Sequence, residues 1–126
     1  MMKELYENCY EAKLSNGLKV LFESRPGRPV SVGIWARLGS RDESDARAGI
    51  SHFLEHMFFK GTKHRTAFQI SEEIDAIGGY INAMTSKEYT AYYVDVLPQH
   101  LERALDVLTD MMQHPLFESL EIEKEK

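Results

Sequence analysis

Two histidines and one glutamate lie within five consecutive residues, His52-Phe53-Leu54-Glu55-His56. Residues four apart on a helix project from the same face, so His52 and His56 can each give an imidazole nitrogen to one metal ion. Glu55 shares this face and can reach a water molecule at an open metal position without being a ligand. We therefore predict that His52 and His56 bind zinc and that Glu55 is the general base. A chance grouping on a core helix is the alternative.

The segment around these residues has the pattern of a buried helix. Its apolar residues recur at helical spacing, and they are Ile50, Phe53, Leu54, Met57 and Phe58. Ser44 or Asp45 can cap a helix that begins near Ala46, and Lys60-Gly61 closes it. On such a helix the motif reads H-x-x-E-H, the inverse of the H-E-x-x-H order of many zinc peptidases. Hydrolysis of peptide bonds is the chemistry that this arrangement favours.

The rest of the sequence supplies strand and helix signals that would position this helix. Asn16-Gly17 is a strong hairpin signal, and Thr66 with Gln69 forms a capping box. The predicted strands are 10–14, 18–22, 30–38, 80–84 and 89–97, and the predicted helices run from about 46 to 60, 66 to 77 and 98 to 114. The order βββ-αα-ββ-α predicts an α+β fold, with a mixed sheet and helices packed mainly on one face.

Composition and charge restrict the class of protein. With 126 residues, 43% hydrophobic and 28% charged, the chain fits one globular domain and is neither disordered nor membrane-embedded. A net charge of −5 argues against a nucleic-acid partner, because phosphate binding needs clustered basic residues. The single Cys9 cannot form an internal disulfide, and no apolar leader or membrane span is visible. We expect no membrane partner and a cytoplasmic location.

Four stretches resemble the pitrilysin family of zinc metallopeptidases, which includes insulin-degrading enzyme and the mitochondrial processing peptidases. They are residues 49–62, 78–85, 88–93 and 114–117. The resemblance implies that residues 1–126 are the N-terminal part of a metallopeptidase domain. The Glu-rich helix expected after Leu116 has no capping residue before Lys126, so the final helix looks truncated.

The resemblance also implies roles for individual residues. His52 and His56 would be zinc ligands, and Glu55 would activate water to cleave unfolded peptides or presequence-like segments. The third zinc ligand of the family is a glutamate that would fall beyond Lys126. Glu125 matches a further family glutamate that supports the metal site without binding the ion. The 126-residue chain alone is therefore expected to be nearly inactive.

Several other residues have both a functional and a plain structural interpretation. Glu88 could orient a ligand histidine, or it could be a solvated hairpin residue. Residues 82–84 (Asn82, Ala83 and Met84) resemble an exposed edge strand to which an extended peptide adds itself, although an internal strand is equally consistent. Of the neighbouring Phe58 and Phe59, one would pack in the core and the other, here assigned as Phe59, could line a side-chain pocket. Three other histidines, His64, His100 and His114, fit no ligand spacing and are interpreted as surface or capping residues.

Two other classes of function compete with a zinc endopeptidase. A non-catalytic structural or regulatory subunit of the same fold is the first, and the intact motif argues against it. A metal-binding domain without hydrolysis is the second, and Glu55 beside the histidines disfavours it. Family members close two similar halves around a chamber, so the resemblance implies a peptide substrate and a second domain or subunit, of which a second copy of this chain is one form.

Overall fold

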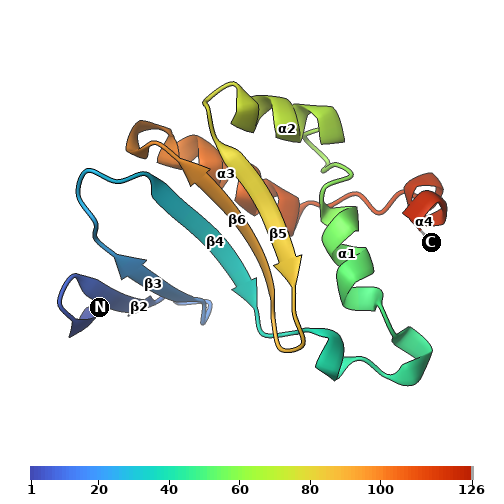
Figure 1. Cartoon of the computed structure of the whole chain (residues 1–126), viewed down its shortest axis with the longest axis horizontal. Helices are drawn as coiled ribbons and strands as arrows, with labels where there is room; N and C mark the ends of the chain where they lie inside the picture. Colours follow the sequence, from blue (N-terminus) through green and yellow to red (C-terminus); the bar gives the residue numbers. More distant parts are fainter. Residues whose placement is uncertain (126) are drawn as a thin grey trace.

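The computed structural model describes residues 1–125 and contains two three-stranded sheets with helices (Figure 1). The strands are β1 (Met2–Tyr6), β2 (Cys9–Lys13), β3 (Lys19–Glu23), β4 (Val30–Ala36), β5 (Tyr80–Thr85) and β6 (Thr90–Val96). The helices are α1 (Ile50–Phe58), α2 (Ala67–Asp75), α3 (Leu101–Gln113) and α4 (Ser119–Glu125), with short 3-10 turns at Ser40–Asp42, Asp45–Arg47 and Pro98–His100. The predicted α+β class is confirmed.

The sheet that carries the candidate site has the strand order β4-β6-β5. Both β4 and β5 pair antiparallel with β6, so that Ile34 and Ala83 each lie opposite Tyr92. The prediction of a mixed sheet was wrong in this respect, since every strand pair within residues 1–125 is antiparallel. The reason is that the tight β5–β6 turn brings β6 back between the two strands that run in the same direction.

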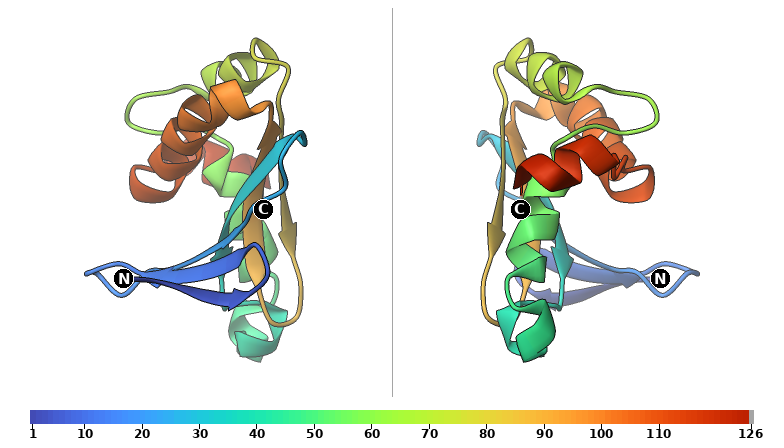
Figure 2. Two further views of the ribbon diagram at one scale, coloured as in Figure 1. Left: turned by 90° about the vertical axis from the view of Figure 1, so that its left-hand side faces the viewer. Right: turned by 90° about the vertical axis from the view of Figure 1, so that its right-hand side faces the viewer.

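The helices cover one face of this sheet, as the sequence predicted (Figure 2). Alternate residues of the strands point toward them, and β6 contributes Tyr92, Val94 and Val96 to the core. The fully buried residues that meet these strands come mainly from α2 and α3, and they are Ile70, Ile74, Ala104, Val107, Leu108 and Met111. Each large apolar side chain buried in this way contributes about 1.5–3 kcal/mol of transfer free energy.

The first three strands form a second sheet that projects from the main body (Figure 2). The predicted Asn16-Gly17 hairpin between β2 and β3 is confirmed, with Gly17 at a φ of 90° that favours glycine. Strand β1 was not predicted, because its sequence has no alternation of apolar and polar residues. It forms because its backbone pairs with β2.

Helix α2 begins where the sequence predicted. The Thr66 hydroxyl accepts a hydrogen bond from the Gln69 backbone N–H at 3.2 Å, and the Gln69 side chain accepts one from the Thr66 N–H at 2.8 Å. This capping box satisfies two N–H groups that the helix itself leaves unpaired. Over residues 1–125, none of the helices is long and apolar enough to cross a membrane.

Candidate metal centre

Helix α1 carries the histidine motif, and its beginning differs from the prediction. The helix starts at Ile50, after Gly49 at a φ of 90°, whereas residues 45–47 form a separate 3-10 turn. The Glu43 carboxylate caps α1 in place of Ser44 or Asp45, because it accepts hydrogen bonds from the N–H groups of Gly49 at 2.7 Å and Ser51 at 2.8 Å. The bonds from Ser51 and Gly49 lower the pKa of Glu43.

One turn of α1 brings the two motif histidines together. The Nε2 atoms of His52 and His56 lie 3.2 Å apart, and the ring centroids lie 4.5 Å apart. Zinc–nitrogen bonds of about 2.0–2.1 Å at a tetrahedral angle would separate two ligand nitrogens by roughly 3.3–3.4 Å. The donor set and its spacing therefore fit a zinc ion bound through both Nε2 atoms.

Glu125 on α4 holds the other ring nitrogen of His56. Its Oε2 lies 3.0 Å from His56 Nδ1, and its Oε1 lies 2.5 Å from the ammonium group of Lys60. Lys60 and then His56 lower the pKa of the Glu125 carboxyl, while Glu125 raises the pKa of Lys60. A charged carboxylate on Nδ1 fixes the ring and leaves Nε2 free to accept a metal.

Glu55 lies beside both histidines, since one ligand atom from each of the three residues falls within 4.8 Å of the others. The Thr85 hydroxyl, at the end of β5, donates a hydrogen bond to Glu55 Oε2. Burial, and in second place the negative charge of Glu55, raises the pKa of Tyr92 beneath the site. Glu55 also borders a hollow of about 450 Å³ whose walls include Phe59, Asn82 and Glu125.

Strand β5 lies at the edge of the described sheet, next to this hollow. The Ser86 N–H bonds to the Tyr89 carbonyl, which fixes the alternation of the hairpin. By that alternation Asn82 and Met84 bond to β6, whereas the Ala83 N–H points away from the sheet. The Asn82 side-chain oxygen accepts a hydrogen bond from this outward N–H at 2.8 Å.

The structure also gives the contacts of Glu88 and of the neighbouring Phe58 and Phe59. Glu88 pairs with Arg41 on the surface, and no contact of Glu88 with a histidine occurs among the described hydrogen bonds. Its role in orienting a ligand histidine stays a prediction. Phe58 packs edge-on against Tyr92 in the core, whereas Phe59 lines the hollow. No sequence pattern predicted the contacts of Thr85, Lys60 and Glu43, because each contact joins residues of separate elements.

Fold and site together define a class of protein: an α+β domain whose inverted H-x-x-E-H helix presents a donor set that fits zinc beside β5, the edge strand of the described sheet. Comparison with known families agrees with this class. The sequence profile of the family described as Insulinase (Peptidase family M16) matches residues 19–126. The chain therefore belongs to peptidase family M16, a family of zinc proteases.

Individual relatives support the same assignment. The chain is 53% identical over 112 residues to the uncharacterized zinc protease YmxG of Bacillus subtilis, covering 88% of this chain and 27% of that protein. It is 49% identical over 114 residues to a probable mitochondrial-processing peptidase subunit beta of Arabidopsis thaliana, covering 90% of this chain and 22% of that protein. A crystal structure of a protease from Helicobacter pylori matches with a TM-score of 0.89 and 28% identity, covering 93% of this chain and 29% of that one. The chain thus spans about a quarter of the length of these relatives.

Proposed function

We propose that this chain provides the zinc helix and the substrate-binding strand of a zinc endopeptidase. The observation that carries the proposal is the 3.2 Å approach of His52 Nε2 to His56 Nε2, with Glu55 on the same face of α1. A bound zinc ion would supply Lewis-acid chemistry, since it polarises water and the carbonyl of a peptide bond. The two histidines would hold that ion, and Glu55 would take the proton from the attacking water.

The surroundings of Glu55 support its role as a base. The Thr85 hydroxyl fixes one carboxylate oxygen, Oε2, and so directs the side chain. The hollow beside it is open enough for a peptide, and Phe59 gives it an apolar wall that could receive a side chain. Glu125 acts on the metal site from outside, because its carboxylate fixes the His56 ring through Nδ1.

The substrate class follows from strand β5. An extended peptide can add itself to a free sheet edge through main-chain hydrogen bonds, which depend little on its sequence. The outward N–H of Ala83 is one donor for such a peptide, and Asn82 would move aside to free it. Met84, exposed on the sheet face, would contact substrate beside the strand. Unfolded peptides or presequence-like segments are therefore the proposed substrates.

The complete enzyme requires parts that lie outside this chain. A catalytic zinc site has three protein ligands, so we assign the third to the remainder of the full-length protein. A second domain or subunit would close the chamber around the substrate, and the names of relatives that are subunits of larger assemblies support such a partner. The 126 residues alone would bind zinc weakly and cleave peptides poorly.

A non-catalytic subunit is the second candidate function. One relative, 38% identical over 91% of this chain, is subunit 1 of the bovine cytochrome b-c1 complex, so proteins similar to this chain include a subunit of a respiratory complex. His52, Glu55 and His56 are all present here and converge on one point. A purely structural role would not need this convergence, and we therefore favour the peptidase.

The test is the substitution Glu55→Gln in the full-length protein, with Glu102→Gln as the matched control. Glu55→Gln should keep zinc and lower the turnover of an unstructured peptide by about two to four orders of magnitude, because loss of a general base has this effect. Glu102→Gln should change turnover little, since Glu102 is an exposed residue of α3 outside the candidate metal centre.

Two results would contradict the assignment. If Glu55→Gln releases zinc in stoichiometric amount, Glu55 is a ligand and not the base. If the wild-type full-length protein binds zinc but cleaves no peptide, the structural or metal-binding function replaces the peptidase.

A further inference from the structure

A second cluster of histidines surrounds Asp110, a buried residue on α3. Its Oδ1 atom lies 2.7 Å from His64 Nδ1 and 3.1 Å from His114 Nδ1. Its Oδ2 atom accepts hydrogen bonds from the Thr62 hydroxyl at 2.7 Å and from the Arg65 guanidinium at 2.8 Å. The two oxygens therefore have separate tasks: Oδ2 is fixed by the protein, whereas Oδ1 faces two imidazole rings.

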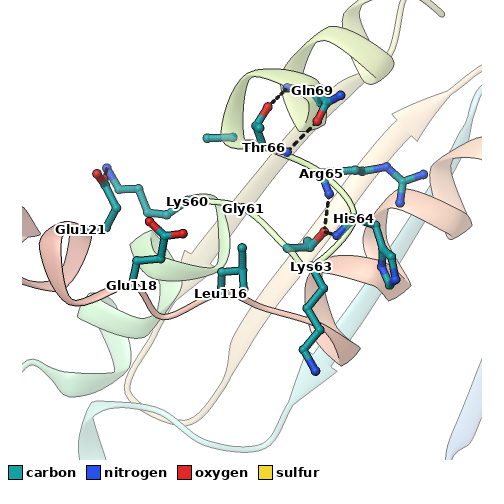
Figure 3. Close-up of a pocket in the computed structure, with 12 residues that line it drawn as sticks. Lys60, Gly61, Lys63, His64, Arg65, Thr66, Gln69, Leu116, Glu118 and Glu121 are labelled. Carbon is teal, nitrogen blue, oxygen red and sulfur yellow. Dashed lines mark hydrogen bonds and ion pairs between the residues drawn. The ribbon is translucent and has the colours of Figure 1, made fainter.

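The backbone holds the two sides of this cluster together. The loop between α1 and α2 pairs with the chain after α3, since Lys63 N–H bonds to the His114 carbonyl at 2.9 Å and Leu116 N–H to the Gly61 carbonyl at 3.0 Å. Figure 3 shows the loop with its side chains diverging: Lys63 points away, while His64 and Arg65 lie over the α3 ribbon. His114 reaches Asp110 because it follows it by one helical turn.

The Asp110 carboxyl carries a negative charge at neutral pH. Burial alone would raise its pKa, but hydrogen bonds from four donors outweigh burial and hold this pKa well below its usual range. The donors are Thr62, His64, Arg65 and His114. A deprotonated carboxylate is the form that binds a metal ion.

The charged groups joined to the cluster by ion pairs do not balance, because they have one negative charge in excess. Arg65 also pairs with Glu73 at 3.0 Å and with Asp106 at 2.5 Å, and Arg103 pairs with Glu73 at 3.2 Å. The network joined by these contacts and Asp110 thus has three carboxylates and two guanidinium groups. With neutral imidazoles its net charge is −1, so a cation would be attracted to Oδ1.

We propose that His64, Asp110 and His114 form a second zinc-binding site, separate from the motif on α1. One ligand atom from each of the three residues lies within 4.8 Å of the others, and two imidazoles with one carboxylate are a donor set that zinc prefers. The present 2.7 and 3.1 Å separations would widen by about 0.6–0.7 and 0.2–0.3 Å, respectively, to reach the roughly 3.3–3.4 Å between ligand atoms of a tetrahedral ion.

The exposure of the cluster fits this assignment. The side chains of His64 and His114 are 60% and 39% exposed, so an ion can enter and water can complete its coordination from the solvent side. The Asp110 side chain below them is 6% exposed and fixed through Oδ2. One rigid ligand with two accessible rings favours a site that fills and empties with the zinc supply.

The experiment measures zinc binding calorimetrically in the full-length protein carrying His52→Ala and His56→Ala, which removes the motif on α1. In this background one zinc ion should still bind, and His64→Ala or His114→Ala should weaken its binding at least about tenfold, since each removes one of three ligands. His100→Ala is the matched control, because His100 lies outside the cluster, and it should leave binding unchanged.

A further variant separates metal binding from the existing hydrogen bonds. His64→Asn keeps an N–H donor for Asp110 but loses the imidazole, so it should weaken zinc binding as His64→Ala does while preserving the fold by circular dichroism. Cobalt substituted for zinc should show a ligand-field absorption that depends on both histidines. Absence of any zinc in the double-alanine background, or zinc that ignores the His64 and His114 substitutions, overturns the proposal.

Discussion

Two places in this chain bring two imidazoles and one carboxylate within reach of a single ion, and they do so in opposite ways. The α1 cluster, defined as His52, Glu55 and His56, comes from one helical turn and its glutamate is partly exposed. The α3 cluster, defined as His64, Asp110 and His114, joins a loop to a helix 46 residues away and has a buried carboxylate. The same donor types therefore occur in two electrostatic settings.

The difference lies in what already holds each carboxylate. Glu55 has one described hydrogen bond, from Thr85, and its second oxygen is left for a proton. Asp110 takes four hydrogen bonds, one of them from the Arg65 guanidinium, so it has no freedom to accept and release protons near neutral pH. The surroundings therefore give Glu55 the freedom that the proposed role of base requires and hold Asp110 as a fixed anion, although both carboxylates lie between histidines.

The largest expected effect is on stability, and it tests how firmly the surroundings hold each carboxylate. Asp110→Ala should lower the free energy of local unfolding of α3 by roughly 1–3 kcal/mol, because it leaves the buried Thr62 hydroxyl without its acceptor and removes one of the three carboxylates that pair with Arg65. Glu55→Ala should cost only about 1 kcal/mol, the typical worth of one hydrogen bond. Amide hydrogen exchange in α1 and α3 of the full-length protein measures both values.

Low pH should also distinguish the two clusters, because it removes the charge of Asp110. The pKa of Asp110 is lower in the folded than in the unfolded state, so its contribution to stability is complete above the unfolded pKa of about 3.9 and is lost as pH falls through the folded value. Protection of α3 should therefore decrease below about pH 4 in the wild type, and Asp110→Ala should lack this component. If Glu55→Ala and Asp110→Ala lost hydrogen-exchange protection to the same extent, the two clusters would not differ in how firmly their carboxylates are held.

The contrast also explains how much could be predicted from the sequence. The α1 cluster was recognisable because all three residues lie on one helix, where spacing alone fixes which side chains meet. The α3 cluster was not recognised. His64 is exposed and His114 is the C-cap residue of α3, as the interpretation of surface or capping residues predicted, but no sequence pattern indicated that both meet Asp110. Their meeting at Asp110 depends on the pairing of residues 61–66 with residues 114–116, which is tertiary structure.

Sequence rules predicted the features of the fold that depend on a few neighbouring residues, and they missed those that depend on contacts with more distant residues. The Thr66–Gln69 capping box and the Asn16-Gly17 turn were confirmed, since each is decided within a few residues. The start of α1 was misplaced because its cap comes from Glu43, six residues before Gly49 and across a separate 3-10 turn. Strand β1 was missed because pairing with β2, and not its own pattern, makes it a strand.

A smaller effect is expected at the support of the α1 cluster. Glu125→Ala should lower zinc affinity at that site by about 10- to 100-fold, because the carboxylate that orients His56 through Nδ1 is lost. Glu121→Ala is the control, since Glu121 pairs with Lys124 and lies 3.9 Å from Lys60 without touching a histidine in the described contacts. Zinc titration of the full-length protein measures both.

The same variant sharpens the comparison of the two clusters. Glu125 makes no described contact with His64, Asp110 or His114, so Glu125→Ala should leave any zinc held by the α3 cluster unchanged. A loss of zinc from both clusters would mean that they are coupled. An unchanged affinity at the α1 cluster would instead reduce the His56–Glu125 contact to a surface ion pair.

The smallest effect concerns substrate binding at β5, which involves neither cluster. Ala83→Pro removes an N–H that points away from the sheet, so the pairing with β6 is kept. One net hydrogen bond is worth about 0.5–1.5 kcal/mol, and peptide affinity should therefore fall roughly two- to tenfold. The measurement is inhibition of the full-length protein by an uncleaved peptide, with zinc content unchanged.

Met84→Pro is the matched control for the direction of the N–H group. By the alternation of the hairpin the Met84 N–H points toward β6, so proline at this position breaks a sheet hydrogen bond and should destabilise β5 as well as weaken binding. Ala83→Pro should keep hydrogen-exchange protection in β6, whereas Met84→Pro should lose it. If peptide affinity is unchanged in folded Ala83→Pro, the substrate does not use this edge, and the peptide-binding strand lies elsewhere in the full-length protein. If both variants lose affinity and protection together, Ala83 is a structural residue of the sheet and its outward N–H has no separate role.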